Sequence, residues 1–554
     1  MLYICLWTLS LPDEVVKTEI KMALKQWPYY DEQIKSVFFS PFYLSLFFFT
    51  TVLFMLKLAK RTKTRLNLPP SPPKLPIIGN LHQLGELPHH SFRKLSRKYG
   101  DMMMLQLGQR KTPTLVVSSA DVVMEMMKNH DLALSNRPQM TPAKILLYGC
   151  KDVGFGHYGE DWRQKRRICV SELLSPKRVA SLHAIREEEA GELVSKLREA
   201  SLKDATVNLS EMIISTLGNI VCQCTLGRKY TGEESRVNVL ARHVMIHIMS
   251  FTVGDYFPLF GWVDVLRGKI REYKETFAEL DGLFDQVIAE HLTEKREKLG
   301  KDFVDILLKI QEESVLDQFE FTKTDLKSLL MDMFVGAIDT TAAALEWAMS
   351  ELVRHPNIMK KAQEEVRKVV GPKSKIEEND VNQLHYLKCV LKETLRFHPP
   401  TPLLAPRETI SQVKLKGYDI PAKTMVYING WAIQRDPEFW ENPEEFIPER
   451  FDQNTEIDIN IQDFHFLTFG FGRRGCPGMN FGVVSVEYLL ANLLYWFDWK
   501  LPEADNGHTQ DIDMSEVFGL VVSRKVPLHV KPIAFSLSSA SLMYWFVLRV
   551  ILVM

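Results

Sequence analysis

Apolar residues recur along most of this 554-residue chain with the period of an amphipathic α-helix. Short apolar runs that read as strands interrupt this pattern. The chain is therefore predicted to be mainly α-helical with small β-sheets, and it contains no internal repeat. The clearest predicted helices span residues 182–200, 271–299, 325–354, 358–370 and 479–497, and the clearest predicted strands span residues 103–107, 114–117 and 425–428.

Residues 37–58 break this pattern with an almost wholly apolar run, VFFSPFYLSLFFFTTVLFMLKL. Its length is close to the roughly 20 residues that cross the hydrocarbon core of a bilayer. A buried core helix is the alternative, but the flanks favour a membrane. Asp31 and Glu32 precede the run, whereas lysines and arginines cluster between residues 57 and 65. The positive-inside rule then predicts a single-pass anchor with the bulk of the chain in the cytosol.

A basic, proline-rich segment, residues 59–76, follows the predicted anchor. It ends in LPPSPPKLP, and so dense a run of proline is stiff and extended. We interpret it as a hinge that leads to one large catalytic domain, residues 77–532. Residues 1–36 form an N-terminal extension. Residues 533–554 form an apolar C-terminal tail that is just long enough to span a membrane or to lie in one.

Charge and cysteine content exclude several classes of protein. The formal net charge is -1 and the pI is near 7.0, so the chain lacks the basic excess of a nucleic-acid-binding protein. The seven cysteines are odd in number and scattered, which is a poor disulfide framework and fits a reducing compartment. Cys222 and Cys224 have only one residue between them, which is not the spacing of a zinc site.

Residues 469–478, FGFGRRGCPG, carry the most informative pattern. Their glycines match G-x-G-x-x-G, but a dinucleotide site also needs a βαβ unit, which the surrounding sequence does not predict. The competing interpretation is a metal-ligand loop, because Cys476 directly precedes the predicted helix 479–497 and a helix N-terminus favours a thiolate. Arg474 could then neutralise a carboxylate of the cofactor. A merely buried Cys476 is the third interpretation, which the dense glycine and arginine setting disfavours.

A second pattern, Gly336-Ala337-Ile-Asp339-Thr340-Thr341, lies in the middle of the predicted helix 325–354. Asp and Thr are poor helix formers in a helix interior. The small residues Gly336 and Ala337 let another group approach the helix backbone. Taken alone, the pattern also fits a threonine that bonds back to its own helix at a packing contact.

Together these patterns resemble the cytochrome P-450 superfamily, and specifically its plant microsomal A-type members (clan 71). The haem signature of that superfamily, F-x-x-G-x-R-x-C-x-G, is filled at every fixed position by Phe469, Gly472, Arg474, Cys476 and Gly478. The resemblance implies the cytochrome P-450 fold and haem b as cofactor. It implies Cys476 as the axial thiolate of the iron and Arg474 on a haem propionate, with Phe469 and Gly478 in the cofactor site. The order and spacing of the motifs agree with the family from about residue 68 to residue 532.

The oxygen-activating helix of this family has the pattern A/G-G-x-D/E-T-T/S, which residues 336–341 match with one departure. The second small residue is usually glycine, and Ala337 narrows the oxygen groove slightly. The resemblance gives Asp339 and Thr340 the catalytic task of delivering protons during O–O cleavage. A second departure lies before the haem signature, where relatives commonly have proline and this chain has Thr468.

Two arginine motifs are also typical of the family. Trp162 and Arg166 fit the pattern W-x-x-x-R, and the resemblance places both on a haem propionate. Arg407 is a weaker candidate for the same role, since a lone arginine is often a solvated surface charge.

Glu393-Thr-Leu-Arg396 and the later Arg450 form the last match. Alone, Glu393 and Arg396 are a common i, i+3 pair of little energetic weight. The resemblance implies that the three residues form a buried structural network that supports the cysteine loop.

The resemblance implies a haem-thiolate monooxygenase that inserts one atom of O₂ into a small hydrophobic plant metabolite. Its electrons would come from NADPH through a separate flavoprotein reductase, and its anchor would lie in the lipid of the endoplasmic reticulum membrane with the catalytic domain facing the cytosol. Two alternatives are a haem-thiolate isomerase or dehydratase, and a non-catalytic haem-binding membrane protein. Neither needs a proton relay, so the intact Asp339 and Thr340 argue against both.

By position in the family, substrate contacts are expected from residues 140–153, 245–257, 334–338, 401–405 and 517–521, most of which are apolar. Relatives usually begin at the anchor and stop near Pro527-Leu528-His529. We therefore expect residues 1–36 and 533–554 to come from faulty gene-model ends.

Overall fold

The computed structural model describes residues 41–59, 66–110, 112–230, 236–293, 302–314, 320–452, 464–502 and 512–535. The chain divides into two units, Met1–Asn67 and Leu68–Met554. In the first unit, helix α3 (Pro41–Ala59) covers most of the predicted anchor, while residues 37–40, the extension 1–36 and the tail from residue 536 on lie outside the described residues. The apolar side chains of α3 have no core to enter, since Phe47 and Phe48 are each 72% exposed.

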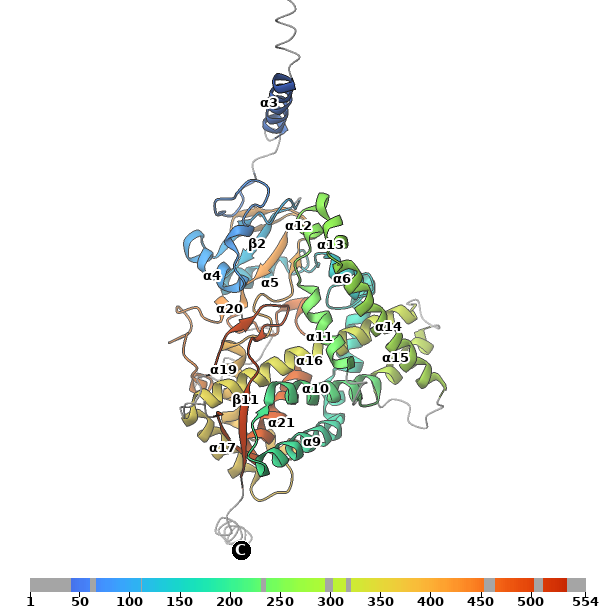
Figure 1. Ribbon diagram of the computed structural model, residues 1–554, viewed down its shortest axis with the longest axis vertical. Helices are drawn as coiled ribbons and strands as arrows, with labels where there is room; N and C mark the ends of the chain where they lie inside the picture. The colour runs from blue at the N-terminus through green and yellow to red at the C-terminus, as the bar shows by residue number, and fades with distance from the viewer. Residues whose placement is uncertain are drawn as a thin grey trace, which may run out of the picture. The chain divides into compact units, whose positions relative to one another are not determined.

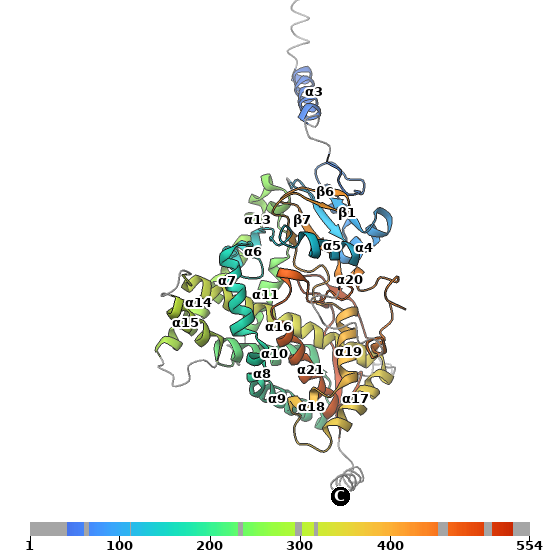
Figure 2. The same ribbon diagram turned by 180° about the vertical axis from the view of Figure 1, so that it is seen from behind.

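The long predicted helix is the centre of the second unit. Helix α16 (Lys323–Arg354) begins at a capping box, in which the Thr322 hydroxyl accepts from the Asp325 N–H and the Asp325 carboxylate accepts from the Thr322 N–H. At 1.5 Å per residue it is about 48 Å long. The helices that pack on it most extensively are α10 (Leu209–Leu226), α11 (Arg236–Ile248), α19 (His385–Phe397) and α21 (Met479–Trp496) (Figures 1 and 2). Most residues of α16 are buried, including charged ones such as Glu346 and Glu351, because the helix lies in the core.

The other predicted helices are found with small shifts at their ends. They are α9 (His183–Leu202), α14 (Lys269–Thr293), α17 (Pro356–Val370) and α21, and residues 294–299 of one prediction lie outside the described residues. The remaining α-helices are α4 (Pro88–Tyr99), α5 (Ala120–His130), α6 (Thr141–Leu146), α7 (Glu160–Ile168), α8 (Pro176–Ser181), α12 (Val253–Tyr256), α13 (Trp262–Leu266), α15 (Phe303–Ser314), α18 (Glu378–Val381) and α20 (Gly430–Ile433).

The three predicted strands meet in one sheet. Its order is β1-β2-β7-β4, with β1 (Met102–Leu105), β2 (Thr114–Val117), β7 (Met425–Ile428) and β4 (Arg407–Glu408). β1 and β2 are antiparallel, whereas β2 and β7 pair in parallel. The smaller sheets among the described residues are β3 (Val207–Asn208), β11 (His529–Ala534) and β8 (Phe497–Lys500); β9 (Glu516–Val517) and β10 (Ser523–Arg524); and β5 (Val413–Leu415) and β6 (Tyr418–Ile420).

Three helical stretches of the described chain are long and apolar enough to cross a membrane, namely Leu209–Leu226, Val237–Tyr256 and Lys323–Arg354. The first and third are 72% buried inside the unit, so the protein core accounts for their apolar character. The cysteines that the structure describes are all free, which agrees with the expected absence of a disulfide framework; Cys5 lies outside the described residues.

The proline-rich segment differs from a free spacer from residue 68 onward. The Pro70 carbonyl accepts a hydrogen bond of 2.8 Å from the Met104 N–H of β1. The Pro73 carbonyl accepts one of 2.8 Å from Gln83 Nε2, and Asn80 Nδ2 donates to the same carbonyl at 3.3 Å. Prolines lack N–H donors, but their carbonyls stay free to accept, so the extended run is bonded to the catalytic unit.

Candidate active site

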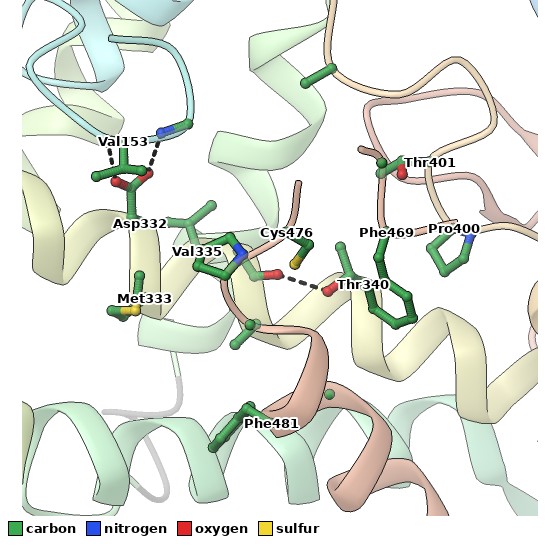
Figure 3. Close-up of a pocket in the computed structure, with 18 of the residues that line it drawn as sticks. Val153, Asp332, Met333, Val335, Thr340, Pro400, Thr401, Phe469, Cys476 and Phe481 are labelled. Carbon is green, nitrogen blue, oxygen red and sulfur yellow. Dashed lines mark hydrogen bonds between the residues drawn. The ribbon is translucent and has the colours of Figure 1, made fainter. Parts of the chain in front are cut away.

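A cavity of about 340 Å³ lies between the central helix α16 and the loop that precedes α21. Figure 3 shows Cys476 of the loop and Thr340 of α16 facing this cavity. Most of the wall is apolar, and its charged side chains are four arginines and Asp332. Phe469, Gly478 and Trp162 also line the cavity. The cysteine loop, the central helix and α7 therefore bring most of the predicted site residues to one place.

Two backbone hydrogen bonds within the cysteine loop fix its shape. The Cys476 N–H donates to the Phe469 carbonyl at 2.8 Å, and the Gly475 N–H donates to the Gly472 carbonyl at 3.0 Å. Gly472 has φ of +62°, and a Cβ atom there would lie 2.5 Å from Asp131 Oδ1. Only glycine meets both demands, so the glycine of the signature is required by the fold of the loop itself.

The Cys476 sulfur lies at the N-terminus of α21, as the sequence predicts. The backbone N–H groups of Gly478 and Met479 bond to it and, with the guanidinium of Arg166, lower its pKa. Burial is the larger effect, however, and raises the pKa of the Cys476 thiol above its usual range. In the protein alone the helix terminus therefore offsets only part of the cost of a buried thiolate.

Arg474 projects from the loop into a cage of backbone carbonyls. It donates to the carbonyls of Ser135 at 2.6 Å and Val153 at 3.0 Å, and also to that of Gly156. Its guanidinium lies 4.2 Å from the centre of the Trp162 ring, whose Nε1–H donates to the Val153 carbonyl as well. These contacts fix Arg474 and Trp162 in the cavity wall.

Three more arginines share this wall: Arg137, Arg166 and Arg407. Arg166 donates to the Gly475 carbonyl beside Cys476, and Arg407 donates to the Phe471 carbonyl at 2.7 Å. Burial lowers the pKa of all four arginines, and the charges of Arg474 and Arg407 lower that of Arg137 further. Arg137 is absent from the sequence prediction, because a buried arginine in a loop has no pattern that separates it from a surface charge.

This donor set fits haem b. A soft thiol that can ligate iron and four clustered guanidiniums face the same cavity. Buried like charges are unfavourable unless an anion joins them, and haem has two carboxylates at one edge. The residues present would thus hold the iron on one side and the propionates on another.

The two predicted proton-delivery residues, Asp339 and Thr340, are adjacent in helix α16 but point in different directions. The Thr340 hydroxyl reaches the cavity and donates to the Gly336 carbonyl at 2.7 Å (Figure 3). Asp339 is not among the residues that line the cavity. Burial raises the pKa of Asp339 to about 6, and the charge of Arg242 on α11 lowers it in part. Adjacent residues of a helix point about 100° apart, which explains why only Thr340 faces inward.

Glu393, Arg396 and Arg450 lie together in one buried network. Arg396 forms a bidentate ion pair with Glu393, at 2.7 and 2.8 Å, and both side chains are 0% exposed. Arg450 Nε lies 3.1 Å from each Glu393 oxygen, and the Ile447 N–H donates to Glu393 at 2.8 Å. Both oxygens of the Glu393 carboxylate therefore accept hydrogen bonds.

Gln434 connects this network to the cysteine loop. Its carbonyl accepts from Arg396 at 2.8 Å, and its side-chain oxygen accepts from the Leu467 N–H at 2.8 Å and from the Thr468 hydroxyl at 3.1 Å. Thr468 directly precedes Phe469, at the position where relatives commonly have proline. Its hydroxyl therefore bonds the start of the cysteine loop to Gln434. The sequence contains no signal for Gln434, since its partners lie far away along the chain.

All five segments expected to contact substrate contribute to the cavity wall. Examples are Leu147, Met245, Val335, Leu404 and Leu520. The wall also includes residues from outside those segments, among them Val221 and Thr225 of α10 and Phe303 of α15.

The fold and this site together define a haem-thiolate oxygenase. The family model described as Cytochrome P450 matches residues 69–531, so the chain belongs to that family. It is 50% identical over 477 residues to the phenylacetaldehyde oxime monooxygenase CYP71AN24 of Prunus mume, which covers 85% of this chain and 90% of the relative. It is also 50% identical to cytochrome P450 71A1 of Persea americana, over 88% of this chain and 98% of the relative. A zebra fish cytochrome P450 solved with progesterone aligns with a TM-score of 0.69 and 25% identity, over 81% of this chain and 100% of that structure.

Family membership establishes the reaction class. The chain is a cytochrome P450 monooxygenase that uses haem b, O₂ and a redox partner, and it acts on plant metabolites. The predicted fold class and the predicted family are both confirmed.

Proposed function

We propose that this chain oxidises a small hydrophobic plant metabolite at a haem whose iron is ligated by Cys476. The observation that carries the proposal is the position of Cys476, at the N-terminus of α21 and in the wall of a cavity lined by four arginines. Arg474, Arg166 and Arg407, with Arg137 added, are the proposed partners of the propionates, and Trp162 supports Arg474. Phe469 and Gly478 complete the cofactor wall. Haem, when bound, supplies the iron at which O₂ is activated.

Thr340 is the residue we propose to hold a proton on the oxygen side of the cavity. Its hydroxyl faces the cavity and can exchange the Gly336 carbonyl for a water molecule as acceptor. Asp339 lies one residue away outside the cavity wall, and burial raises its pKa to about 6. A group with such a pKa can take up and release a proton near neutral pH, so we assign it the outer position in the relay.

The apolar wall favours a compact apolar substrate. Because a relative with 50% identity is named a phenylacetaldehyde oxime monooxygenase, aryl aldoximes are the first substrates to test. Another relative, 44% identical, is named desmethylyatein synthase, so the precursor of desmethylyatein is the second substrate to test.

We further propose an NADPH-dependent flavoprotein reductase as redox partner and the endoplasmic reticulum membrane as location. The exposed apolar side chains of α3 and the basic residues that follow them support a single-pass anchor with the catalytic unit in the cytosol. The lipid would cover α3, whose Phe47, Phe48 and Phe54 side chains are exposed.

The test is a reduced carbon monoxide difference spectrum of the full chain in detergent, compared with Cys476→Ala. Cys222→Ala is the control, since Cys222 is a buried cysteine that does not line the cavity. A strongly red-shifted Soret band in the wild type and in Cys222→Ala, lost in Cys476→Ala, is the expected result. An unshifted band in the wild type would refute Cys476 as thiolate ligand. Turnover of phenylacetaldehyde oxime that continues without NADPH would favour the isomerase or dehydratase instead.

A further inference from the structure

One stretch of the cavity wall has no regular secondary structure. Val153, Gly154 and Phe155 line the cavity from the loop between α6 and α7, residues 147–159. Backbone N–H groups in such a loop need partners other than a helix or a sheet. The groups that accept hydrogen bonds from these N–H groups therefore determine how rigid this part of the cavity wall is.

Asp332 of α16 supplies them. Its Oδ2 accepts a hydrogen bond of 2.6 Å from the Val153 N–H, and its Oδ1 accepts a longer one of 3.4 Å from the Gly154 N–H (Figure 3). Asp332 lies two turns before Thr340 on the same helix and itself lines the cavity. One carboxylate thus bonds two successive peptide groups of the loop to the helix on the oxygen side.

Val153 is bonded from both sides of the cavity. While its N–H donates to Asp332, its carbonyl accepts from Trp162 Nε1 at 2.9 Å and from Arg474 Nη1 at 3.0 Å. Trp162 and Arg474 belong to the proposed propionate side. The Val153 residue therefore connects the central helix with the cofactor cations, and a shift of the loop would move both connections.

A second buried acid lies beside this contact. Asp152 is 1% exposed, its Oδ2 accepts from the Phe155 N–H at 2.6 Å, and its Oδ1 has no hydrogen-bond partner within the described part of the chain. A Cβ atom built on Gly154 would lie 3.2 Å from Asp152 Oδ2 and 3.3 Å from Asp332 Oδ1, so both carboxylates border Gly154. Two carboxyl groups this close repel each other when both are ionised. The N–H groups and arginines around them offset that repulsion, so a loop position farther from these groups is disfavoured.

We propose that Asp332 is a positioning residue that fixes the Val153–Gly154 wall of the cavity and thereby controls how a substrate lies in it. The proposal rests on the proposed use of this cavity as the substrate and haem site. The effect of Asp332 passes through the loop, which Asp152 shapes from within by accepting a hydrogen bond from the Phe155 N–H.

The first test measures the loop directly and requires no substrate. Hydrogen–deuterium exchange of the full chain is compared between wild type, Asp332→Ala and Asp332→Asn, with Asp339→Asn as control on the same helix. Asp332→Ala removes both acceptors, so exchange of peptides that span residues 150–158 should rise by about tenfold. Asp332→Asn keeps one acceptor oxygen and should give a smaller rise, and Asp339→Asn should leave the exchange of these peptides unchanged.

Each outcome of the exchange experiment counts for or against the proposal. The red-shifted carbon monoxide band confirms that a variant is folded with haem bound. Wild-type exchange in the loop of haem-loaded Asp332→Ala overturns the proposal. If Asp332→Ala does not retain haem, Asp332→Asn decides: faster loop exchange than in Asp339→Asn supports the proposal, and equal exchange refutes it.

The second test follows selectivity with phenylacetaldehyde oxime as probe. Asp332→Asn should raise KM and increase the NADPH consumed per product by about threefold or more, with the carbon monoxide band intact. Normal loop exchange with a raised KM for this oxime would mean that Asp332 acts on the substrate directly, which also overturns the proposal. If the probe is not turned over at all, the substrate assignment fails while the exchange experiment still stands.

Discussion

Replacing Glu393 with glutamine should destabilise the protein strongly although the side chain keeps its size. Glu393 accepts hydrogen bonds from Arg396, Arg450 and the Ile447 N–H, and neither Glu393 nor Arg396 is exposed. Glutamine retains one acceptor oxygen and directs an NH₂ group at a guanidinium that also donates. The substitution leaves the Arg396 charge buried without its counterion.

Breaking a buried pair by removing one partner costs about 3–5 kcal/mol, because the remaining charge stays desolvated. That is a large part of a native stability of about 5–15 kcal/mol. The control is Glu364→Gln, since Glu364 and Lys360 form an ion pair of 3.9 Å with side chains 68% and 77% exposed. Losing that exposed pair should cost about 0.5 kcal/mol or less.

The assay is urea unfolding followed by circular dichroism, with the reduced carbon monoxide band recorded in parallel. Because Arg396 bonds to Gln434, and Gln434 to Leu467 and Thr468, the haem band should be lost at lower urea than the helical signal. A Glu393→Gln midpoint no lower than that of Glu364→Gln would refute the argument that this buried network supports the cysteine loop.

Three further substitutions test the site. Gly472→Ala should reduce the haem bound per protein much more than Gly268→Ala, since both have positive φ but only at Gly472 would a Cβ clash, at 2.5 Å from Asp131. Arg166→Gln removes a charge that lowers the pKa of Cys476, so a larger share of the carbon monoxide band should appear at the unshifted position. The pKa of Asp339 is raised to about 6 in the fold, so this group stabilises the fold below about pH 4 and loses that contribution as the pH rises through 6. Asp339→Asn should therefore have a larger free energy of unfolding than the wild type at pH 7, by up to about 3 kcal/mol, and should unfold at a higher temperature, with both gaps closing toward pH 4. A constant gap across that range would contradict the raised pKa.

Helices and strands could be predicted from the sequence because their signals are local. The predicted helix 325–354 differs from α16 by only two residues at its start, since the signals that mark its ends, the capping residue Thr322 and the proline at residue 356, closely flank the stretch. The parallel pairing of residues 114–117 with residues 425–428 has no local signal. The bonding of the proline-rich segment to β1 was likewise not predictable, because it depends on donors that arrive from later in the chain.

The site residues also differ in whether the local sequence indicates them. Cys476 and Thr340 fall in short motifs whose residue types are rare in combination, so the sequence could indicate them. Arg137, Gln434 and Asp332 act through hydrogen bonds to groups that are distant in the sequence, and such residues look like any polar residue of a loop or a helix. Asp339 shows the converse, because a motif residue lies outside the cavity wall once the helix turns it away.

The two sides of the cavity are held by different kinds of contact, and this difference should separate the effects of mutation. The thiolate side depends on a charged network that is fully desolvated, so its loss is costly and should appear as loss of haem. The oxygen side depends on two backbone hydrogen bonds to Asp332, one of them long, in a loop without regular secondary structure. Such bonds contribute about 1 kcal/mol each, which is too little to unfold the protein but enough to move a wall. Variants of Glu393 should therefore lose haem. Variants of Asp332 should keep their full haem content and change in substrate selectivity.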